Sequence, residues 1–126
     1  MTDSSVSGLD WVKTQAASSG KPSVVSMSLG GSASRALDRA VSALTSAGIH
    51  IAVAAGNDDD DASYYSPARV PSAITVGAST IDDVRASFSN YGKPVDIFAP
   101  GQDVISAWNT DDTVRSISYF QRIQHC

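Results

Sequence analysis

Asn57 ends a stretch of small and apolar residues that reads VAAGN at residues 53–57, where a polar side chain is placed to do chemistry. Apart from His50, residues 49–53 are apolar and rich in β-branched side chains, which is typical of a buried parallel strand. In open α/β sheets, ligands bind outside the carboxyl ends of such strands. The small residues leave room for a ligand against the backbone, and the Asn57 amide offers neutral hydrogen-bond donors. The alternative is a plain Gly-Asn turn after the strand.

The aspartates, the cysteine and the histidines form no clear catalytic or metal-binding motif. Residues 58–61 are four consecutive aspartates, whose mutual repulsion favours a solvated loop over the alternative of a metal site. The single cysteine, Cys126, allows no internal disulfide. The two histidines, His50 and His125, lie far apart in the sequence and share no motif. No cysteine and histidine set has the spacing of metal ligands.

The elements that position Asn57 follow from the apolar periodicity. Residues 23–28 and 49–54 are predicted strands, and an apolar stripe predicts a helix between them over residues 33–47. Ser32 or Ser34 caps this helix, and Gly48 suits its left-handed end. The order strand, helix, strand is the crossover of a parallel sheet. The loops at residues 29–31 and 55–57 then leave the same edge of the sheet and form a candidate cleft.

The rest of the chain supplies more strands. Helical spacing predicts a first helix at residues 5–18, and prolines predict an extended segment at residues 66–71. Strands are expected at residues 73–78, 95–98 and 104–108, with a tight polar loop at residues 85–92. From Thr113 onward the pattern is polar, and no helix is assigned.

Composition narrows the classes of function. The chain has 126 residues, which is one domain or part of a larger one, and 42% of them are hydrophobic. A net charge of −4 argues against a nucleic-acid partner. No apolar run is long enough to cross a bilayer, so we expect no membrane partner. The first residues have neither the charge nor the apolar core of a signal peptide.

Six short blocks of sequence carry a family resemblance. They read SMSLGG at residues 26–31, VAAGN at 53–57, YSPA at 65–68, TVGA at 75–78, SFSNYG at 87–92 and DIFAPG at 96–101. In this order they resemble the subtilisin-like serine proteases, most closely the secreted fungal branch related to proteinase K. The resemblance covers residues 6–118. It implies an α/β fold, a partial subtilisin-like parallel sheet with βαβ crossovers, incomplete at both ends. The expected domains are a partial peptidase domain at residues 1–118 and a divergent tail at 119–126.

The resemblance implies a secreted endopeptidase with an Asp-His-Ser triad. Asn57 matches the family's oxyanion-hole asparagine. The segments expected to bind substrate are Ser28, Leu29 and Gly30, which pair with the substrate backbone, and Ala54, Ala55 and Gly56, which form the far wall of the primary specificity pocket. Small walls imply a roomy, mostly apolar pocket and broad specificity. The implied partners are a peptide or protein substrate and an inhibitory propeptide.

The resemblance also implies a structural calcium site, while catalysis requires no cofactor. Asp96, with the backbone carbonyls of Pro71 and Ala73, matches a calcium site of the proteinase K branch. One carboxylate and two carbonyls are the hard oxygen ligands that calcium prefers. Alternatively, Asp96 caps a local turn or forms a salt bridge.

The catalytic triad itself is missing from the pattern. The family's aspartate and histidine motifs, Asp-Thr/Ser-Gly and His-Gly-Thr, do not occur, and Gln121 occupies the place of the nucleophilic serine. We therefore expect a fragment that retains the binding segments and is inactive alone. The rival hypothesis is a non-catalytic protein that binds peptide or propeptide. A nucleotide-binding α/β domain is a weaker third option, because residues 29–32 lack phosphate-loop glycine spacing.

An incomplete sheet has a physical cost. Open strand edges and an uncovered apolar face favour association between chains. We therefore expect the 126-residue chain to be marginally stable or prone to aggregation.

Overall fold

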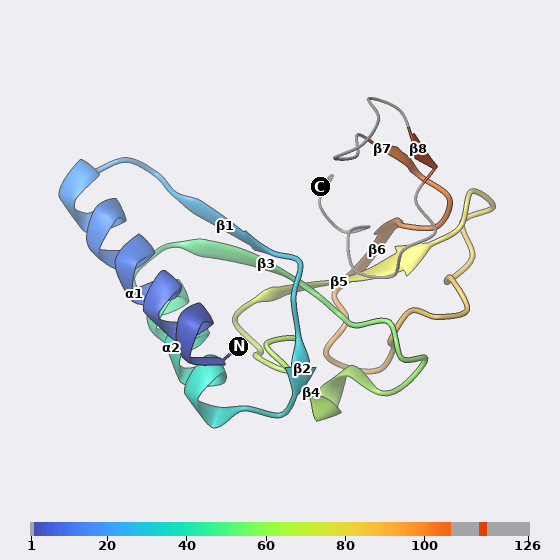
Figure 1. Cartoon of the computed structure of the whole chain (residues 1–126), viewed down its shortest axis with the longest axis horizontal. Helices are drawn as coiled ribbons and strands as arrows, with labels where there is room; N and C mark the ends of the chain where they lie inside the picture. The colour runs from blue at the N-terminus through green and yellow to red at the C-terminus, as the bar shows by residue number, and fades with distance from the viewer. Residues whose placement is uncertain (1, 107–113, 116–126) are drawn as a thin grey trace.

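The computed structural model describes residues 2–106 and 114–115 (Figure 1). The main elements are α1 (Thr2–Ser19), β1 (Val24–Met27), α2 (Arg35–Ser46), β3 (His50–Ala54), β5 (Ile74–Ser79) and β6 (Ile97–Pro100). The shorter elements are β2 (Gly31–Ser32), η1 (Ala62–Tyr64), β4 (Tyr65–Ser66), β7 (Ile105–Ser106) and β8 (Val114–Arg115). The predicted tail at residues 119–126, Gln121 included, lies outside the described residues.

The central sheet is parallel and has the strand order β1-β3-β5-β6. Val25 pairs with Ile51 and Met27 with Val53, so β1 and β3 run side by side and end together. The predicted crossover from β1 through α2 to β3 is confirmed. The predicted α/β class with a parallel sheet is confirmed as well.

α2 has the start and stop signals that the sequence predicts. Ser34 is the N-cap, and its hydroxyl accepts a hydrogen bond from the backbone N–H of Leu37 at 3.4 Å. Gly48 follows the helix with φ of +83°, a left-handed conformation that glycine adopts without strain. Leu37, Val41 and Leu44 form the buried stripe that packs on the sheet.

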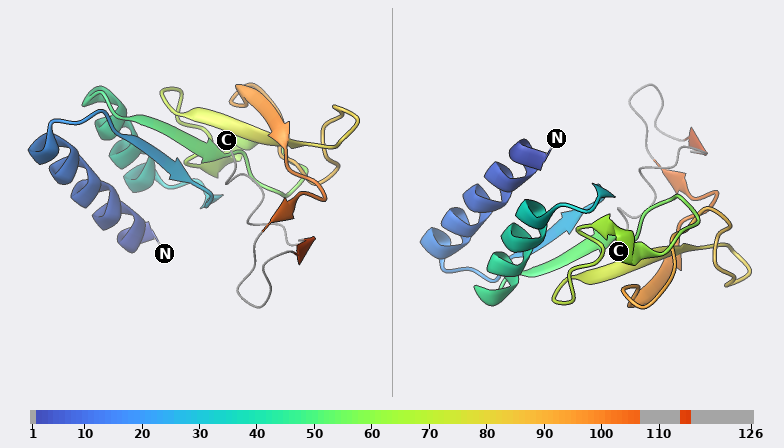
Figure 2. Two further views of the ribbon diagram at one scale, coloured as in Figure 1. Left: turned by 90° about the horizontal axis from the view of Figure 1, so that it is seen from above. Right: turned by 90° about the horizontal axis from the view of Figure 1, so that it is seen from below.

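α1 lies beside α2 on the same side of the sheet (Figure 2). Leu9 joins the buried core, and Val12 and Ala16 pack against it. The helix begins at Thr2, three residues earlier than the predicted residue 5, and ends at Ser19. Thus one face of the sheet is covered by two helices.

Some local predictions were wrong. Residues 66–71 are not extended throughout, because the Val70 N–H donates to the Pro67 carbonyl and closes a turn after β4. β6 is shifted by two residues from the predicted 95–98. β7 covers two residues of the predicted strand at 104–108, whose last two residues lie outside the described part of the chain.

The face of the sheet opposite the helices carries exposed apolar side chains. Val24 on the edge strand β1 is 74% exposed, and Ile97 on the opposite edge strand β6 is 55% exposed. The strand registers place Ile74 on the same face. Among the described residues, no helix is both long and apolar enough to span a membrane.

Replacing Val24 by lysine should increase the fraction of the chain that stays monomeric. A lysine on an edge strand opposes pairing with the edge of a second chain. Size-exclusion chromatography of the 126-residue chain measures this fraction. The control is Trp11→Lys, because Trp11 is 65% exposed but lies on α1. An equal gain from both variants would show a general effect of charge and contradict the edge-strand explanation.

Candidate functional site

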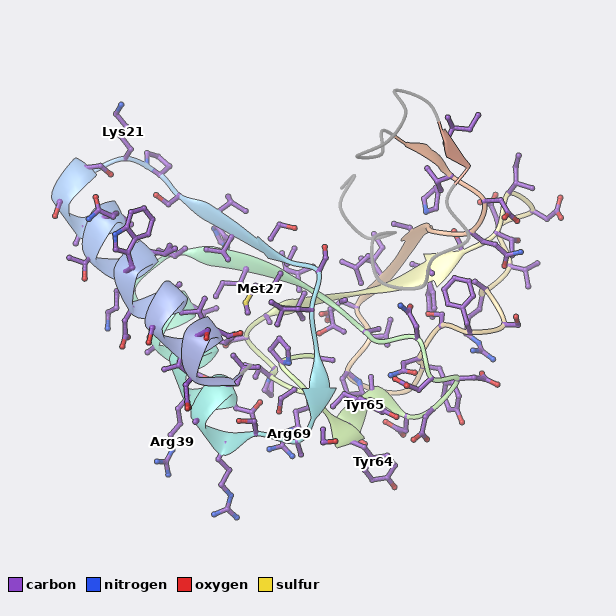
Figure 3. The ribbon with its side chains drawn as sticks, in the orientation of Figure 1. Lys21, Met27, Arg39, Tyr64, Tyr65 and Arg69 are labelled. Carbon is purple, nitrogen blue, oxygen red and sulfur yellow. The ribbon has the colours of Figure 1, made fainter. Side chains whose placement is uncertain are left out.

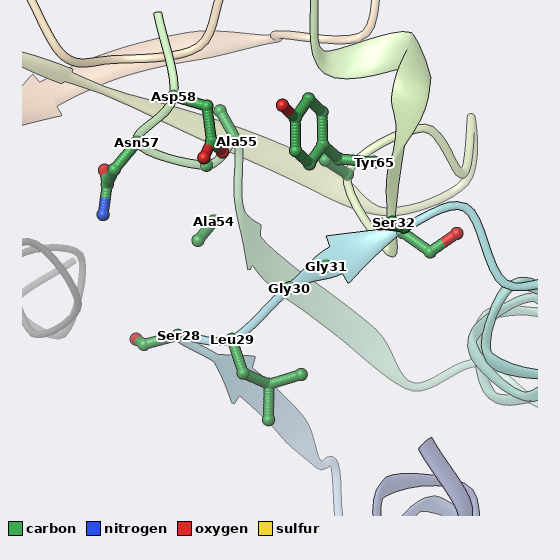
Figure 4. Close-up of a pocket in the computed structure, with 13 residues that line it drawn as sticks. Ser28, Leu29, Gly30, Gly31, Ser32, Ala54, Ala55, Asn57, Asp58 and Tyr65 are labelled. Atoms are coloured by element: carbon green, nitrogen blue, oxygen red, sulfur yellow. The ribbon is translucent and has the colours of Figure 1, made fainter. Parts of the chain in front are cut away.

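The candidate site is a cleft of about 430 Å³ at the carboxyl ends of β1 and β3 (Figure 4). Three chain segments line it, at residues 28–32, 54–58 and 65–68. The first two leave the parallel strands side by side, as the crossover predicts. The third belongs to β4, which pairs antiparallel with β2. Open α/β sheets bind ligands at this place.

All predicted site residues of the two strand ends line this cleft. They are Ser28, Leu29, Gly30, Ala54, Ala55, Gly56 and Asn57. Gly31, from the predicted cleft loop at residues 29–31, lines the cleft as well. Five further lining residues were not predicted to do so, namely Ser32, Asp58, Tyr65, Ser66 and Ala68. Tyr65, Ser66 and Ala68 lie in one of the family-like blocks, which is the signal that could have identified them.

Asn57 lies half-buried in the loop that follows β3. Within the described residues, its side-chain amide makes no hydrogen bond, so both its donors and its acceptor remain available to a ligand. Gly56 before it has φ of +108°, and a Cβ atom there would lie 2.2 Å from Asn90 Nδ2. Only glycine fits at this position.

A charged network anchors the β2–β4 wall of the cleft to α2. The Ser66 hydroxyl donates to Asp38 Oδ1 at 2.6 Å and accepts from the Ser34 N–H at 2.8 Å. Asp38 Oδ2 also pairs with Arg69, with 2.8 Å to Nε and 2.6 Å to Nη2. Figure 3 shows Arg69 near the start of α2. Both arginine bonds go to one carboxylate oxygen and the other oxygen accepts from Ser66, so each oxygen of Asp38 has a partner, and the bonds to arginine are charge-assisted.

Two of the four consecutive aspartates, Asp59 and Asp61, have partners that do not line the cleft. Asp59 forms an ion pair with Arg85 at 2.7 Å. Asp61 caps η1 by accepting the Ser63 N–H at 2.8 Å, and this hydrogen bond lowers the pKa of the Asp61 carboxyl. A lowered pKa adds stability above about pH 3.9, which is lost as the pH falls through the folded value. The described residues contain no group of three His, Cys, Asp or Glu side chains able to hold a metal.

The other two aspartates lie near Tyr65. The Tyr65 hydroxyl donates to Asp60 Oδ2 at 3.3 Å, and Asp58 lines the cleft beside it. Figure 4 shows the Tyr65 hydroxyl directed toward the loop that carries Asp58. Burial, and then the negative charges of Asp58 and Asp60, raises the pKa of the Tyr65 phenol. The cleft therefore has a negative end.

Of the predicted calcium ligands, Asp96 pairs with the backbone of Thr75 in β5. Asp96 Oδ2 accepts the Thr75 N–H at 2.7 Å, and the Asp96 N–H donates to the Thr75 carbonyl at 2.9 Å. Thr75 follows the other two predicted ligands in the sequence, Ala73 by two residues and Pro71 by four. Asp96 is exposed. The alternative prediction, a local structural role for Asp96, is met by this hydrogen bond to a backbone N–H.

His50 does not belong to the cleft. It is the single histidine among the described residues, and it lies exposed at the first position of β3, at the opposite end of the strand from Asn57.

Comparison with known proteins decides the family. The model of the Subtilase family, Peptidase S8, matches residues 2–125. The chain belongs to the subtilase family. An extracellular serine proteinase of Thermus sp. (strain Rt41A) is 58% identical over 108 residues, which cover 86% of this chain and 26% of the relative.

Fungal proteins and a solved structure resemble this subtilase chain as well. Subtilisin-like serine protease Pen ch 18 of Penicillium rubens is 61% identical over 99 residues, covering 78% of this chain and 20% of the relative. The crystal structure of a cold adapted subtilisin-like serine proteinase matches with a TM-score of 0.84 and 47% identity. That match covers 92% of this chain and 42% of the other. The chain spans about a quarter or less of the length of the curated relatives it matches.

Replacing Asp60 by asparagine should lower the pKa of Tyr65, because one of the nearby negative charges is removed. The raised pKa means that Tyr65 adds stability below about pH 10, which is lost as the pH rises through the folded value. The ultraviolet absorbance of phenolate during an alkaline titration follows this group, and Tyr65→Phe identifies its contribution. Asp82→Asn, on an exposed turn, is the control. An unchanged Tyr65 titration in Asp60→Asn would contradict the assignment.

Proposed function

We propose that this chain supplies the substrate-binding segments and the oxyanion donor of a subtilisin-like serine endopeptidase. The observation that carries the proposal is the position of Asn57. Its side-chain amide, which makes no hydrogen bond within the described residues, lines a cleft at the carboxyl ends of two parallel strands, within a chain of the subtilase family. In this reaction a serine attacks the peptide carbonyl, a histidine takes the serine's proton, and an aspartate orients the histidine.

The proposed role of Asn57 is to donate a hydrogen bond to the oxyanion that forms on the carbonyl oxygen. A donor that is already in place stabilises this charge without reorganising during the reaction. In subtilisin, a relative, removing such a donor costs about 3–4 kcal/mol of transition-state stabilisation. That value belongs to subtilisin and sets the scale for the role proposed here.

The substrate is proposed to be a peptide or protein that binds as an added strand. Ser28, Leu29 and Gly30 leave β1 with Gly30 close to the Ser66 carbonyl, where a Cβ atom would lie at 3.4 Å. Ala54 and Ala55 are too small to fill the cleft, which supports broad specificity for apolar side chains. The extracellular serine proteinase of Thermus supports secretion of the enzyme that contains this chain.

The 126 residues contain neither the aspartate motif nor the histidine motif, and Gln121 stands at the place of the serine. The proposed activity therefore needs groups that this chain does not supply. The second candidate function, non-catalytic binding of a peptide or an inhibitory propeptide, rests on the same cleft. The two differ in whether any form of the protein hydrolyses the peptide it binds.

We predict that the 126-residue chain binds an apolar tetrapeptide and does not hydrolyse it. Binding is measured by fluorescence anisotropy, and hydrolysis by release of a chromogenic amine with and without a serine-reactive phosphonate. Gly56→Ala should weaken binding at least tenfold, because the added Cβ atom meets Asn90 Nδ2 at 2.2 Å. Gly8→Ala is the control, because no atom lies within 4 Å of its Cβ position.

Each outcome of this experiment has a distinct meaning. Hydrolysis that the phosphonate abolishes would show that the chain contains its own nucleophile, contrary to the proposal. Peptide binding that Gly56→Ala leaves unchanged would place the peptide outside the cleft. If a longer form of the protein also binds without hydrolysis, the non-catalytic alternative is correct.

We also propose that Asp96 and the carbonyl oxygens of Pro71 and Ala73 hold a structural calcium ion. The donor set fits, because it consists of hard oxygen atoms and because Asp96 is exposed, so that water molecules can complete a shell of 6–8 ligands. The ion would stabilise the junction of β5 and β6, where Asp96 already binds the backbone of Thr75.

Calcium at 100 times its dissociation constant should stabilise the chain by about 2.7 kcal/mol. Thermal unfolding with calcium and with a chelator measures this difference. Asp96→Asn should abolish it, while retaining an oxygen that accepts the Thr75 N–H. Asp82→Asn should preserve it. An equal effect of calcium on the wild-type chain and on Asp96→Asn would place the ion elsewhere.

A further inference from the structure

Asn90 is a completely buried amide, with 0% of its surface exposed. It lies in the loop between β5 and β6, more than 30 residues along the chain from Asn57. Its Nδ2 donates to the Ala55 carbonyl at 3.0 Å. Its Oδ1 accepts two backbone N–H groups, that of Asp58 at 2.8 Å and that of Asp60 at 3.2 Å. Every one of these bonds goes to the loop that carries Asn57.

Hydrogen bonds to Asn90 hold the residue before Asn57 and the residue after it. The backbone N–H of Asn90 donates to the Gly56 carbonyl at 2.9 Å, directly before Asn57. The Asp58 N–H, directly after Asn57, donates to the Asn90 side chain. Asn57 itself has no hydrogen bond to the described residues through its side chain. The amide of Asn57 thus projects into the cleft from a backbone that is fixed on either side.

The contact between the loop and Asn90 leaves no free space. A Cβ atom on Gly56 would lie 2.2 Å from Asn90 Nδ2 and 3.0 Å from Asn90 Cγ. The backbone at Gly56 therefore rests directly on the Asn90 amide. Removing that amide would create space beneath the loop. It would also leave three backbone groups, the Ala55 carbonyl and the N–H groups of Asp58 and Asp60, without their present partner.

Other hydrogen bonds hold the same two loops together at a distance from Asn57. The Asp59 N–H donates to the Phe88 carbonyl at 2.9 Å, and the Tyr91 N–H donates to the Asp60 carbonyl at 3.0 Å. These bonds do not involve the Asn90 side chain. These bonds should hold the two loops together when the Asn90 side chain is replaced. The effect of that replacement on Asn57 can then be measured separately from unfolding.

We propose that Asn90 is a positioning residue for Asn57, and that its side chain sets the direction in which the Asn57 amide faces the cleft. This inference rests on the proposed role of Asn57 as the oxyanion donor. Asn90 does not touch the substrate. It acts through the backbone of residues 55–60.

The first measurement follows the position of Asn57 itself. In the nuclear magnetic resonance spectrum of the 126-residue chain, the side-chain amide signal of Asn57 is assigned by its loss in Asn57→Ala. Asn90→Ala should shift or broaden that signal. The matched control is Ser89→Ala, because Ser89 is also 0% exposed and loses hydrogen bonds to Ala78 and Asn90 but has none to residues 55–60.

The second measurement follows the donor function of Asn57. Two tetrapeptides of one sequence, ending in a carboxylate or in an amide, are compared, since the carboxylate oxygen stands in for the oxyanion. The wild-type chain should bind the carboxylate form about tenfold more tightly. Asn57→Ala and Asn90→Ala should bring the ratio close to one, with the affinity for the amide form changed less than about twofold. A merely structural role of Asn90 would weaken both peptides equally.

The outcomes separate the two proposals. An Asn57 signal that Asn90→Ala does not move, or that Ser89→Ala moves as much, overturns the positioning role. A ratio lost in Asn57→Ala but kept in Asn90→Ala overturns it too and leaves the oxyanion proposal standing. A wild-type ratio of one contradicts the oxyanion role, while the signal of Asn57 still decides the positioning role. If Asn90→Ala does not fold, Asn90→Asp is used, which keeps the acceptor for Asp58 and Asp60.

Discussion

The parallel pairing of β1 with β3 is the constraint on which the cleft depends. Because Met27 lies opposite Val53, the chain leaves both strands at one edge, and residues 28–32 begin beside residues 54–58. The connection between the strands is α2, which Val41 and Leu44 hold against the sheet. Burying side chains of this size contributes about 1.5–3 kcal/mol each. Strand pairing and core packing therefore place the two strand ends side by side without any contribution from the loops.

The loop that carries Asn57 depends on a second set of contacts, which comes from residues 88–91. These contacts are hydrogen bonds between backbone groups and a single buried side chain, Asn90, rather than apolar packing. Hydrogen bonds are directional, so they can fix the angle of a neighbouring group in a way that apolar contacts cannot. A site that stabilises a charge in one location requires that property of its supporting loop.

The sequence predicted the parts of the fold that leave a local pattern. The stripe in α2 and the β-branched run in β3 reflect burial directly, so the crossover and both strand ends were correctly placed. The pairing of Ser32 with Tyr65 was missed, because strands of two residues are too short to show a period. The bonds of Asn90 were missed for a different reason. They join segments more than 30 residues apart and impose no spacing on either segment.

The error at residues 66–71 has a similar origin. Proline restricts the residue that precedes it, and this restriction favours an extended backbone at Ser66, where β4 indeed lies. It does not govern the residues that follow Pro67, and the Val70 N–H returns to the Pro67 carbonyl. The prediction extended the restriction on the residue before proline to residues that it does not govern. The family-like block at residues 65–68 contains three residues that line the cleft, but neither it nor periodicity was used to predict them there.

The order of Asn57 and Asp58 places a neutral donor next to a negative charge, which limits how the site can work. A carboxylate beside an oxyanion would oppose the charge that Asn57 is proposed to stabilise. In Figure 4 the two side chains diverge, with Asp58 on the side of Tyr65. The Asp58 N–H is held by Asn90, so the direction in which the Asp58 side chain leaves the loop is fixed by the same buried amide. In the proposed role, Asn90 thus does two things with one side chain, because it directs a donor toward the reacting oxygen and keeps a carboxylate away from it.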